Sequence, residues 1–94
     1  MKYKILYVEK VYEEDIPSLS KENRVRIRNA VTEKLTVSPE VFGKPLRTSM
    51  KGFRSLRVGD YRVIFLIRED SVLILAIMHR SVVYRNVQYR VNVL

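Results

Sequence analysis

Arginines occupy positions of a predicted hairpin where residues that only build the sheet would be expected. Residues 57–62 read Arg-Val-Gly-Asp-Tyr-Arg, and Gly-Asp between two runs rich in β-branched and aromatic residues is typical of a two-residue hairpin loop. This loop places Arg57 directly opposite Arg62 on one face of the sheet, where like charges repel. Because guanidinium groups are always charged and bind phosphate through paired hydrogen bonds, the arrangement indicates phosphate binding.

The only histidine, His79, is predicted to join this face. A second turn, at residues 69–70 or 70–71, connects the next two strands, and either two-residue choice keeps the alternation of side chains. Leu73, Leu75, Ile77 and His79 then share the face of Arg62, whereas a three-residue turn would break this relation. Histidine is well suited to proton transfer near neutral pH. A purely structural histidine and solvated strand arginines are the alternatives.

Composition indicates a single domain, residues 1–94, with an anionic partner. Eighteen Lys and Arg against ten Asp and Glu give a formal charge of +8 over 94 residues, which favours a polyanion or an acidic protein. The acidic residues cluster before residue 41, so the basic surface belongs to the second half of the chain. The absence of cysteine excludes disulfides and thiolate metal sites.

The order of predicted elements defines an α+β fold. A strand over residues 1–8 is followed by a short acidic helix at 9–16, a helix at 21–36 with an N-cap at 18–20, and a loop at 41–50. Three strands joined by tight turns follow, and the state of residues 81–94 stays open. We expect both helices on one face of a mostly antiparallel four-stranded sheet, with the other face partly open.

Several classes of protein are disfavoured. The longest apolar run, residues 72–78, is far shorter than the ~20 residues of a membrane span, and the N-terminus shows no signal-peptide pattern. We therefore expect a cytoplasmic protein without a membrane partner. The sequence shows no paired carboxylates, glycine-rich phosphate loop, nucleophile elbow or metal-ligand cluster, which disfavours hydrolases and nucleotide enzymes of those types.

Three short motifs resemble those of the RelE/ParE toxin superfamily, over nearly the whole chain. They are Gly-Lys-Pro-Leu-Arg at 43–47, Gly-Phe-Arg at 52–54 followed by residues 56–65, and His-Arg-Ser at 79–81 with Val-Tyr at 83–84. The resemblance implies a RelE-like fold of the microbial ribonuclease type. It also implies a toxin of a type II toxin–antitoxin system. The RelE branch cleaves messenger RNA in the ribosomal A site without a metal, and the ParE branch poisons DNA gyrase.

The resemblance also implies site residues. Arg62 matches the arginine of the family's Tyr-Arg motif, Tyr84 its C-terminal tyrosine, and Arg80 a basic residue near the end of the last strand. Arg54 and Leu56 stand where some RelE members have lysines, and this departure leaves His79 as the natural replacement for a lysine in proton transfer. The predicted catalytic residues are Arg62, His79, Arg80 and Tyr84, and the predicted phosphate-binding residues are Lys44, Arg47, Lys51, Arg54 and Arg57.

The sequence thus predicts a ribosome-dependent, metal-independent endoribonuclease, an mRNA interferase that inhibits translation. Its expected partners are a cognate antitoxin and messenger RNA on the ribosome, with contacts to 16S ribosomal RNA, and no metal or small-molecule cofactor is expected. The antitoxin is expected to lie over the basic sheet half or to displace residues 81–94. A gyrase inhibitor of the ParE kind and a non-catalytic RNA- or antitoxin-binding homologue are the alternatives.

Overall fold

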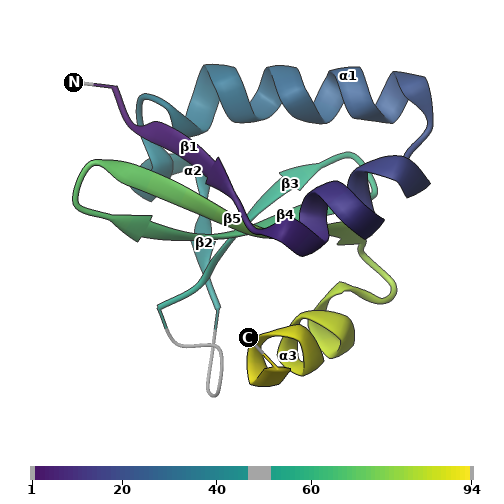
Figure 1. The fold of residues 1–94 in the computed structure, drawn as a ribbon. Helices are drawn as coiled ribbons and strands as arrows, with labels where there is room; N and C mark the ends of the chain where they lie inside the picture. Colours follow the sequence, from purple (N-terminus) through teal and green to yellow (C-terminus); the bar gives the residue numbers. More distant parts are fainter. Residues whose placement is uncertain (1, 47–51, 94) are drawn as a thin grey trace.

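A five-stranded sheet forms the centre of the computed structural model, which describes residues 2–46 and 52–93 (Figure 1). The strand order is β1-β5-β4-β3-β2, with β1 parallel to β5 and the other neighbours antiparallel. The strands are β1 (Lys4–Tyr7), β2 (Lys44–Pro45), β3 (Arg54–Val58), β4 (Tyr61–Arg68) and β5 (Ser71–His79). The predicted α+β class is confirmed. The fifth strand arises within the predicted loop, where Lys44 pairs with Ser55.

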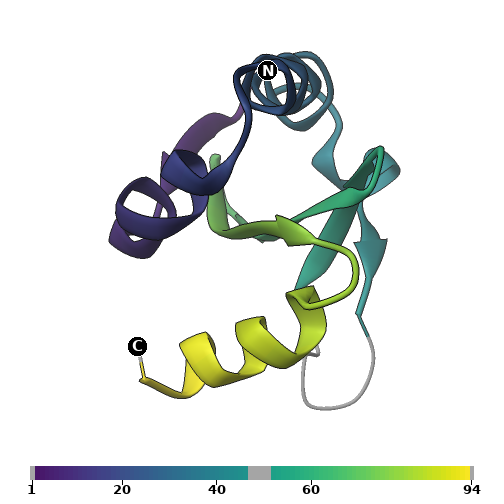
Figure 2. The ribbon, with the colours of Figure 1, turned by 90° about the vertical axis from the view of Figure 1, so that its right-hand side faces the viewer.

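Helical segments from the first half of the chain cover one face of the sheet (Figure 2). The long one begins where Ser20 accepts a hydrogen bond from the Asn23 amide at 3.1 Å, as expected of an N-cap. Its buried residues Ile27, Val31 and Leu35 recur every fourth position and pack against the sheet. The segments are η1 (Val11–Asp15), η2 (Ile16–Ser18), α1 (Lys21–Ala30), η3 (Val31–Leu35) and α2 (Pro39–Phe42).

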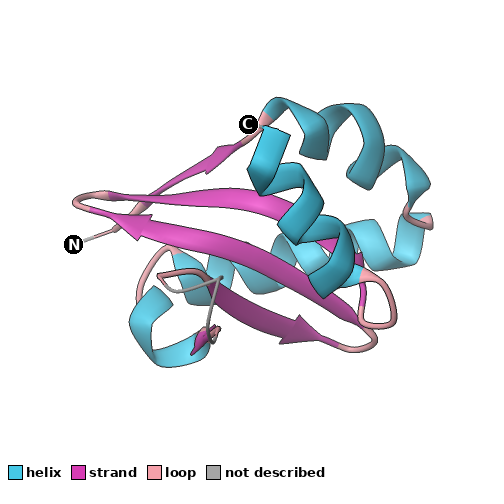
Figure 3. Cartoon of the chain, turned by 90° about the horizontal axis from the view of Figure 1, so that it is seen from below, coloured by secondary structure: helices cyan, strands magenta, loops and turns pink. Residues whose placement is uncertain are grey.

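The opposite face is covered by the C-terminal helix α3 (Val83–Val93), as Figure 3 shows from below. The buried residues Val83 and Val87 lie on one side of α3 and pack against Ile64, Leu75 and Ala76. The expectation of a partly open second face is therefore wrong for the region under α3. This valine stripe forms a second, smaller core on the side of the sheet away from α1.

A β-bulge in β5 changes the face on which His79 lies. Arg68 pairs with Ser71, so the turn is Glu69–Asp70, one of the two predicted turns. The register then shifts at Ile64 and Phe65, because Phe65 pairs with Ile74 and Ile64 with Ala76, which leaves one extra residue on β5. Beyond the bulge His79 pairs with Tyr61, and Arg62 pairs with Met78. The prediction that His79 shares the face of Arg57 and Arg62 is wrong.

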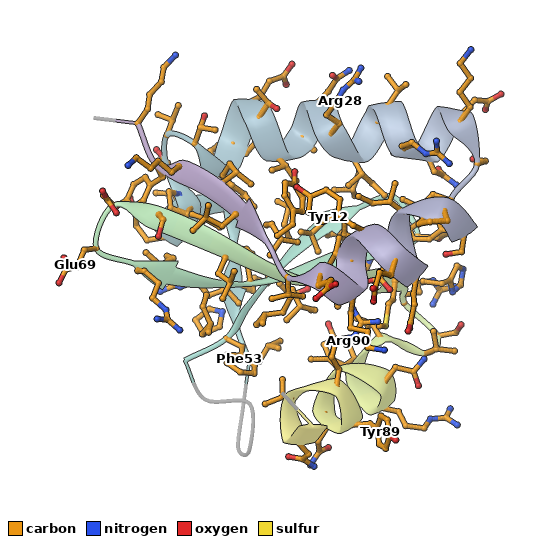
Figure 4. All side chains as sticks on the ribbon, viewed as in Figure 1. Tyr12, Arg28, Phe53, Glu69, Tyr89 and Arg90 are labelled. Atoms are coloured by element: carbon orange, nitrogen blue, oxygen red, sulfur yellow. The ribbon has the colours of Figure 1, made fainter. Side chains whose placement is uncertain are left out.

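A buried ion pair hydrogen-bonds to the edge of β5 beyond the end of its pairing with β1. Asp15 accepts a hydrogen bond from the Ile77 amide at 2.9 Å, and Arg90 donates to the Leu75 carbonyl at 3.0 Å. Two further bonds, of 2.7 and 2.9 Å, join the guanidinium of Arg90 to both carboxylate oxygens of Asp15. Figure 4 shows Arg90 reaching from α3 toward the sheet. The pair links η1, β5 and α3 through side chains that take the place of a neighbouring strand.

Candidate phosphate-binding site

The β3–β4 turn carries the arginine pair that the sequence predicted. Arg57 pairs with Arg62, and Gly59 at the turn has φ of +60°, a conformation that glycine adopts without strain. The side chain of Arg62 bends back to this turn, where its Nη1 donates to the carbonyls of Gly59 at 3.0 Å and Tyr61 at 2.9 Å. These bonds fix the guanidinium while the charge of Arg62 has no carboxylate partner among the described residues.

Arg80 joins the same turn from the end of β5. Its amide donates to the Asp60 carbonyl at 2.8 Å, and its Nε lies 3.5 Å from the Asp60 carboxylate. Both side chains are mainly exposed, so the ion pair is weak and readily exchanged for another anion. The backbone hydrogen bond holds Arg80 near the turn and does not involve its guanidinium group.

Arg26 of α1 is a fourth arginine at this turn, and the sequence analysis missed it. A methyl group added to Gly59 would lie 2.7 Å from Nη1 of Arg26, so the guanidinium rests directly on the glycine. Arg26 and Arg57 also line a common recess of about 270 Å³ together with Lys34. No local signal could have found Arg26, because its contact depends on how α1 packs on the sheet. We call Arg26, Arg57, Arg62 and Arg80 the hairpin arginine cluster.

His79 lies beside the cluster but faces a different space. Its ring packs edge-on against the Tyr61 ring, with centroids 5.6 Å apart. Its Nδ1 accepts a hydrogen bond from the Ser81 amide at 3.1 Å and lies 2.8 Å from the Ser81 hydroxyl. Since Nδ1 accepts, the neutral ring carries its proton on Nε2 and presents a donor there. The catalytic role of His79 stays a prediction, and this tautomer disfavours it as a general base.

The other predicted residues do not all join the cluster. Arg54 donates to the carbonyls of Gly43 at 2.9 Å and Glu40 at 3.3 Å, which ties β3 to the end of α2. By strand alternation it lies on the face opposite Arg57. Lys44 is exposed on the edge strand β2, and Tyr84 is exposed in the first turn of α3. Arg47 and Lys51 lie outside the described residues.

The charges of the described residues suit anions better than cations. Within residues 2–46 and 52–93, no group of three or more His, Cys, Asp or Glu side chains could hold a metal ion. In the same ranges no helix is both long enough and apolar enough to cross a membrane. The cluster thus offers guanidinium groups for phosphate oxygens, a task to which arginine is suited by charge and shape.

Sequence comparison assigns this small basic α+β protein to a class of toxins. The family model of the ParE toxin of type II toxin–antitoxin systems matches residues 9–84. The chain belongs to this family, within the RelE/ParE toxin superfamily.

Named relatives support this assignment. Toxin RelE of Mycobacterium tuberculosis is 44% identical over 50 residues, which are 51% of this chain and 52% of that protein. The match thus spans about half the length of that relative. Toxin RelG of the same organism is 39% identical over 66 residues, 64% of this chain and 76% of its own. The crystal structure of the toxin–antitoxin complex RelBE2 from M. tuberculosis has a TM-score of 0.79 at 27% identity, covering 85% of this chain and all of that one.

Proposed function

We propose that this toxin is a ribosome-dependent endoribonuclease that cleaves messenger RNA in the A site and so inhibits translation. The observation that carries the proposal is the hairpin arginine cluster, whose four cations border one turn, where Asp60 is only weakly held and Glu33 lines the recess of Arg26 and Arg57. The likeness to Toxin RelE and the predicted motifs support the same activity.

RNA cleavage without a metal requires deprotonation of the 2′-hydroxyl, stabilisation of the charged phosphate and protonation of the 5′-oxygen. Arg57 and Arg62 are proposed to hold the phosphate, because guanidinium donors stabilise charge that develops during reaction, and Arg62 is fixed in advance by its bonds to the turn. Arg80, which is held only loosely by Asp60, would add a third cation. Tyr84 on the first turn of α3 is the proposed proton-transfer group or base-stacking side chain.

Three further basic residues are proposed to contact the RNA. Lys44, Arg47 and Lys51 come from the stretch before β3 and are proposed to bind phosphates of the message or of 16S ribosomal RNA. Such contacts add affinity without adding sequence information. The site of action would be the cytoplasm, where the ribosomes are.

A cognate antitoxin is the second proposed partner, since the RelBE2 structure is a toxin–antitoxin complex. We propose that an acidic antitoxin segment covers the hairpin arginine cluster while α3 stays docked. Displacement of α3 would expose Val83 and Val87 and separate Asp15 from Arg90. Breaking a buried ion pair costs several kcal/mol, on the order of 3–5 kcal/mol, so binding beside α3 is favoured over its displacement.

Gyrase inhibition is a second candidate function, because the family model that matches the chain is that of a ParE toxin. In this case the basic turn would bind gyrase rather than RNA, and no residue would need to transfer protons. A non-catalytic homologue would bind RNA or antitoxin with no toxicity.

Induced expression with separate readouts distinguishes these functions. Cells expressing the toxin are followed for translation rate, for cut transcripts by primer extension, and for a DNA-damage response. Early translation arrest with cut transcripts is the expected result for wild type. Arg62→Ala should lose both effects, and Arg68→Ala, at the far end of β4, is the matched control that should keep them. A DNA-damage response with intact transcripts would overturn the nuclease in favour of gyrase inhibition.

A further inference from the structure

A cavity of about 810 Å³ lies between η1, the end of β5 and α3, outside the hairpin arginine cluster. Its walls come from segments distant in sequence. Lys10 and Glu14 border it on the η1 side, Tyr61 and His79 on the sheet side, and Arg85 and Asn86 on the α3 side. Its volume is within the usual range for small-molecule sites, about 300–1,000 Å³. Of the residues that line the cavity, His79 alone is among the predicted site residues.

The cavity is held open by bonds that do not depend on a ligand. The Asp15–Arg90 pair forms part of its lining and fastens α3 to η1 and to β5. Both side chains are more than nine-tenths buried. The ring of His79 is held on one side by Ser81 and on the other by Tyr61. The walls are thus pre-organised, which reduces the entropy that binding must offset.

Polar groups of the lining remain available to a ligand. Arg85 and the side-chain amide of Asn86 make no hydrogen bond or ion pair with any described residue. Lys10 is paired only with the exposed carboxylate of Glu14 at 2.9 Å. His79 presents an Nε2 donor because Nδ1 is already bonded. Cations and donors, together with the paired carboxylates of Glu14 and Asp15, therefore border a lining that also includes apolar side chains, those of Ile77, Met78 and Val82.

An aromatic wall, an apolar floor and the rim cations Arg85 and Lys10, the latter paired with Glu14, together match one class of ligand. A nucleobase is flat, with an apolar face and polar edges, and stacks on aromatic side chains. A phosphate is bound by guanidinium and ammonium groups. We propose that this cavity binds a single nucleotide of an RNA chain, with the base against Tyr61 and His79 and the phosphate toward Arg85 and Lys10.

This proposal rests on the proposed RNA substrate and deepens it. His79 lines the cavity and precedes Arg80 in the chain, but its side chain lies on the face opposite Arg62, so the cavity is a site separate from the hairpin arginine cluster. The cavity would then bind a further nucleotide of the same RNA chain, away from the cleaved bond, and contribute to base preference. Hydrogen-bonding contacts to base edges are what confer such preference in RNA recognition.

Titration of the free toxin by NMR tests the cavity without the ribosome. The probes are the four ribonucleoside monophosphates and inorganic phosphate, observed through backbone amide shifts. Saturable shifts at residues 10, 79, 85 and 86 with a nucleotide are expected. Inorganic phosphate should bind more weakly there. Arg85→Gln should weaken nucleotide binding by about tenfold, the size of one charge-assisted hydrogen bond. Arg68→Gln, which is remote from the cavity, is the matched control and should leave the shifts unchanged.

Several results would overturn the proposal. They are the absence of saturable shifts at millimolar nucleotide, equal affinity for inorganic phosphate, or shifts confined to the hairpin arginine cluster. Tighter binding of a short acidic peptide at the same residues would assign the cavity to a protein partner instead. The titration needs no cleavage. A wild-type toxin that cuts transcripts but binds no nucleotide in the cavity would therefore contradict the cavity proposal and leave the proposed endoribonuclease intact.

Discussion

At the scale of single residues, Arg62 has the environment of a functional side chain rather than of a sheet-building one. It lies opposite Arg57 and donates to two carbonyls of its own turn. Arg62→Ala loses those bonds but also relieves the repulsion, so stability should change by about 1 kcal/mol or less. Cleavage should fall by about 10²–10³-fold, the usual cost of one donor to a developing charge.

Two measurements check the Arg62 prediction. Thermal unfolding followed by circular dichroism reports the fold, and single-turnover cleavage of ribosome-bound message reports the chemistry. A variant that is inactive because it is unfolded would assign Arg62 a structural role.

His79 is expected to bind substrate rather than to transfer protons. The Ser81 amide donates to its Nδ1, so proton uptake at this nitrogen would break an existing bond. His79→Gln keeps a side-chain donor and should retain cleavage within about tenfold, well short of the ~10²–10⁴-fold typical of general acid–base catalysis. The rate should keep its wild-type dependence on pH between about 5 and 8. A larger loss with a flattened pH profile would restore His79 as the acid or base.

Glu14 makes a small contribution that depends on pH. Its pKa is lowered because Lys10 donates a hydrogen bond to it and attracts its charge. The contribution of this carboxylate is therefore fully present above its ordinary pKa of 4.5 and is lost as the pH falls through the lowered value. In urea unfolding at acid pH, Glu14→Gln should show a shallower loss of stability than wild type. If the two proteins lose stability equally as the pH falls, the exposed Lys10–Glu14 pair contributes nothing to the free energy of unfolding.

At the scale of elements, the Asp15–Arg90 pair is expected to be the contact most sensitive to change. Asp15→Ala leaves a buried guanidinium without its carboxylate and the Ile77 amide without its acceptor. The free energy of unfolding should drop by about 3–5 kcal/mol. That is a large part of the ~5–15 kcal/mol of a typical domain.

A double-mutant cycle separates the energy of the ion pair from that of the hydrogen bonds that Asp15 and Arg90 make to the edge of β5. Asp15→Leu with Arg90→Met should recover only part of the loss seen in each single variant, because the Leu75 carbonyl and Ile77 amide stay unpaired. Urea unfolding measures all four proteins. Full recovery would show that the edge of β5 does not need these partners.

The sequence predicted those elements that are determined by residues close together in the chain. Gly59–Asp60 gave the hairpin and the Arg57–Arg62 register, and Ser20 gave the start of α1. The bulge in β5 was missed because Leu75 and Ala76 are both apolar, so the sequence shows no break in pattern there. The helix at the C-terminus was obscured by its valines and tyrosines, which have lower helix propensity than alanine or leucine. Arg26 at the turn and the Asp15–Arg90 pair arise only from packing.

At the scale of the whole molecule, the charge distribution predicts how the antitoxin approaches. The formal charge is +8, and the hairpin arginine cluster contributes four cations beside one acidic residue of the turn. An acidic antitoxin segment should therefore associate faster at low ionic strength, because charges at the surface steer the encounter within the Debye length. Stopped-flow mixing across a series of salt concentrations measures this. An association rate that does not respond to salt would contradict electrostatic steering.

The affinity for the antitoxin, from the association and dissociation rates in the same assay, tests whether α3 stays docked. Val87 is fully buried against the sheet, and Val87→Ala should weaken the docking of α3 by about 1–2 kcal/mol, given ~0.8 kcal/mol per buried carbon. A partner that displaces α3 would then bind more tightly by up to the same free energy, whereas a partner that leaves α3 in place would gain nothing. We expect no gain in antitoxin affinity for Val87→Ala, and likewise none for the control Val25→Ala on the outer surface of α1. A tenfold tightening confined to Val87→Ala would show that the antitoxin replaces α3 on the sheet.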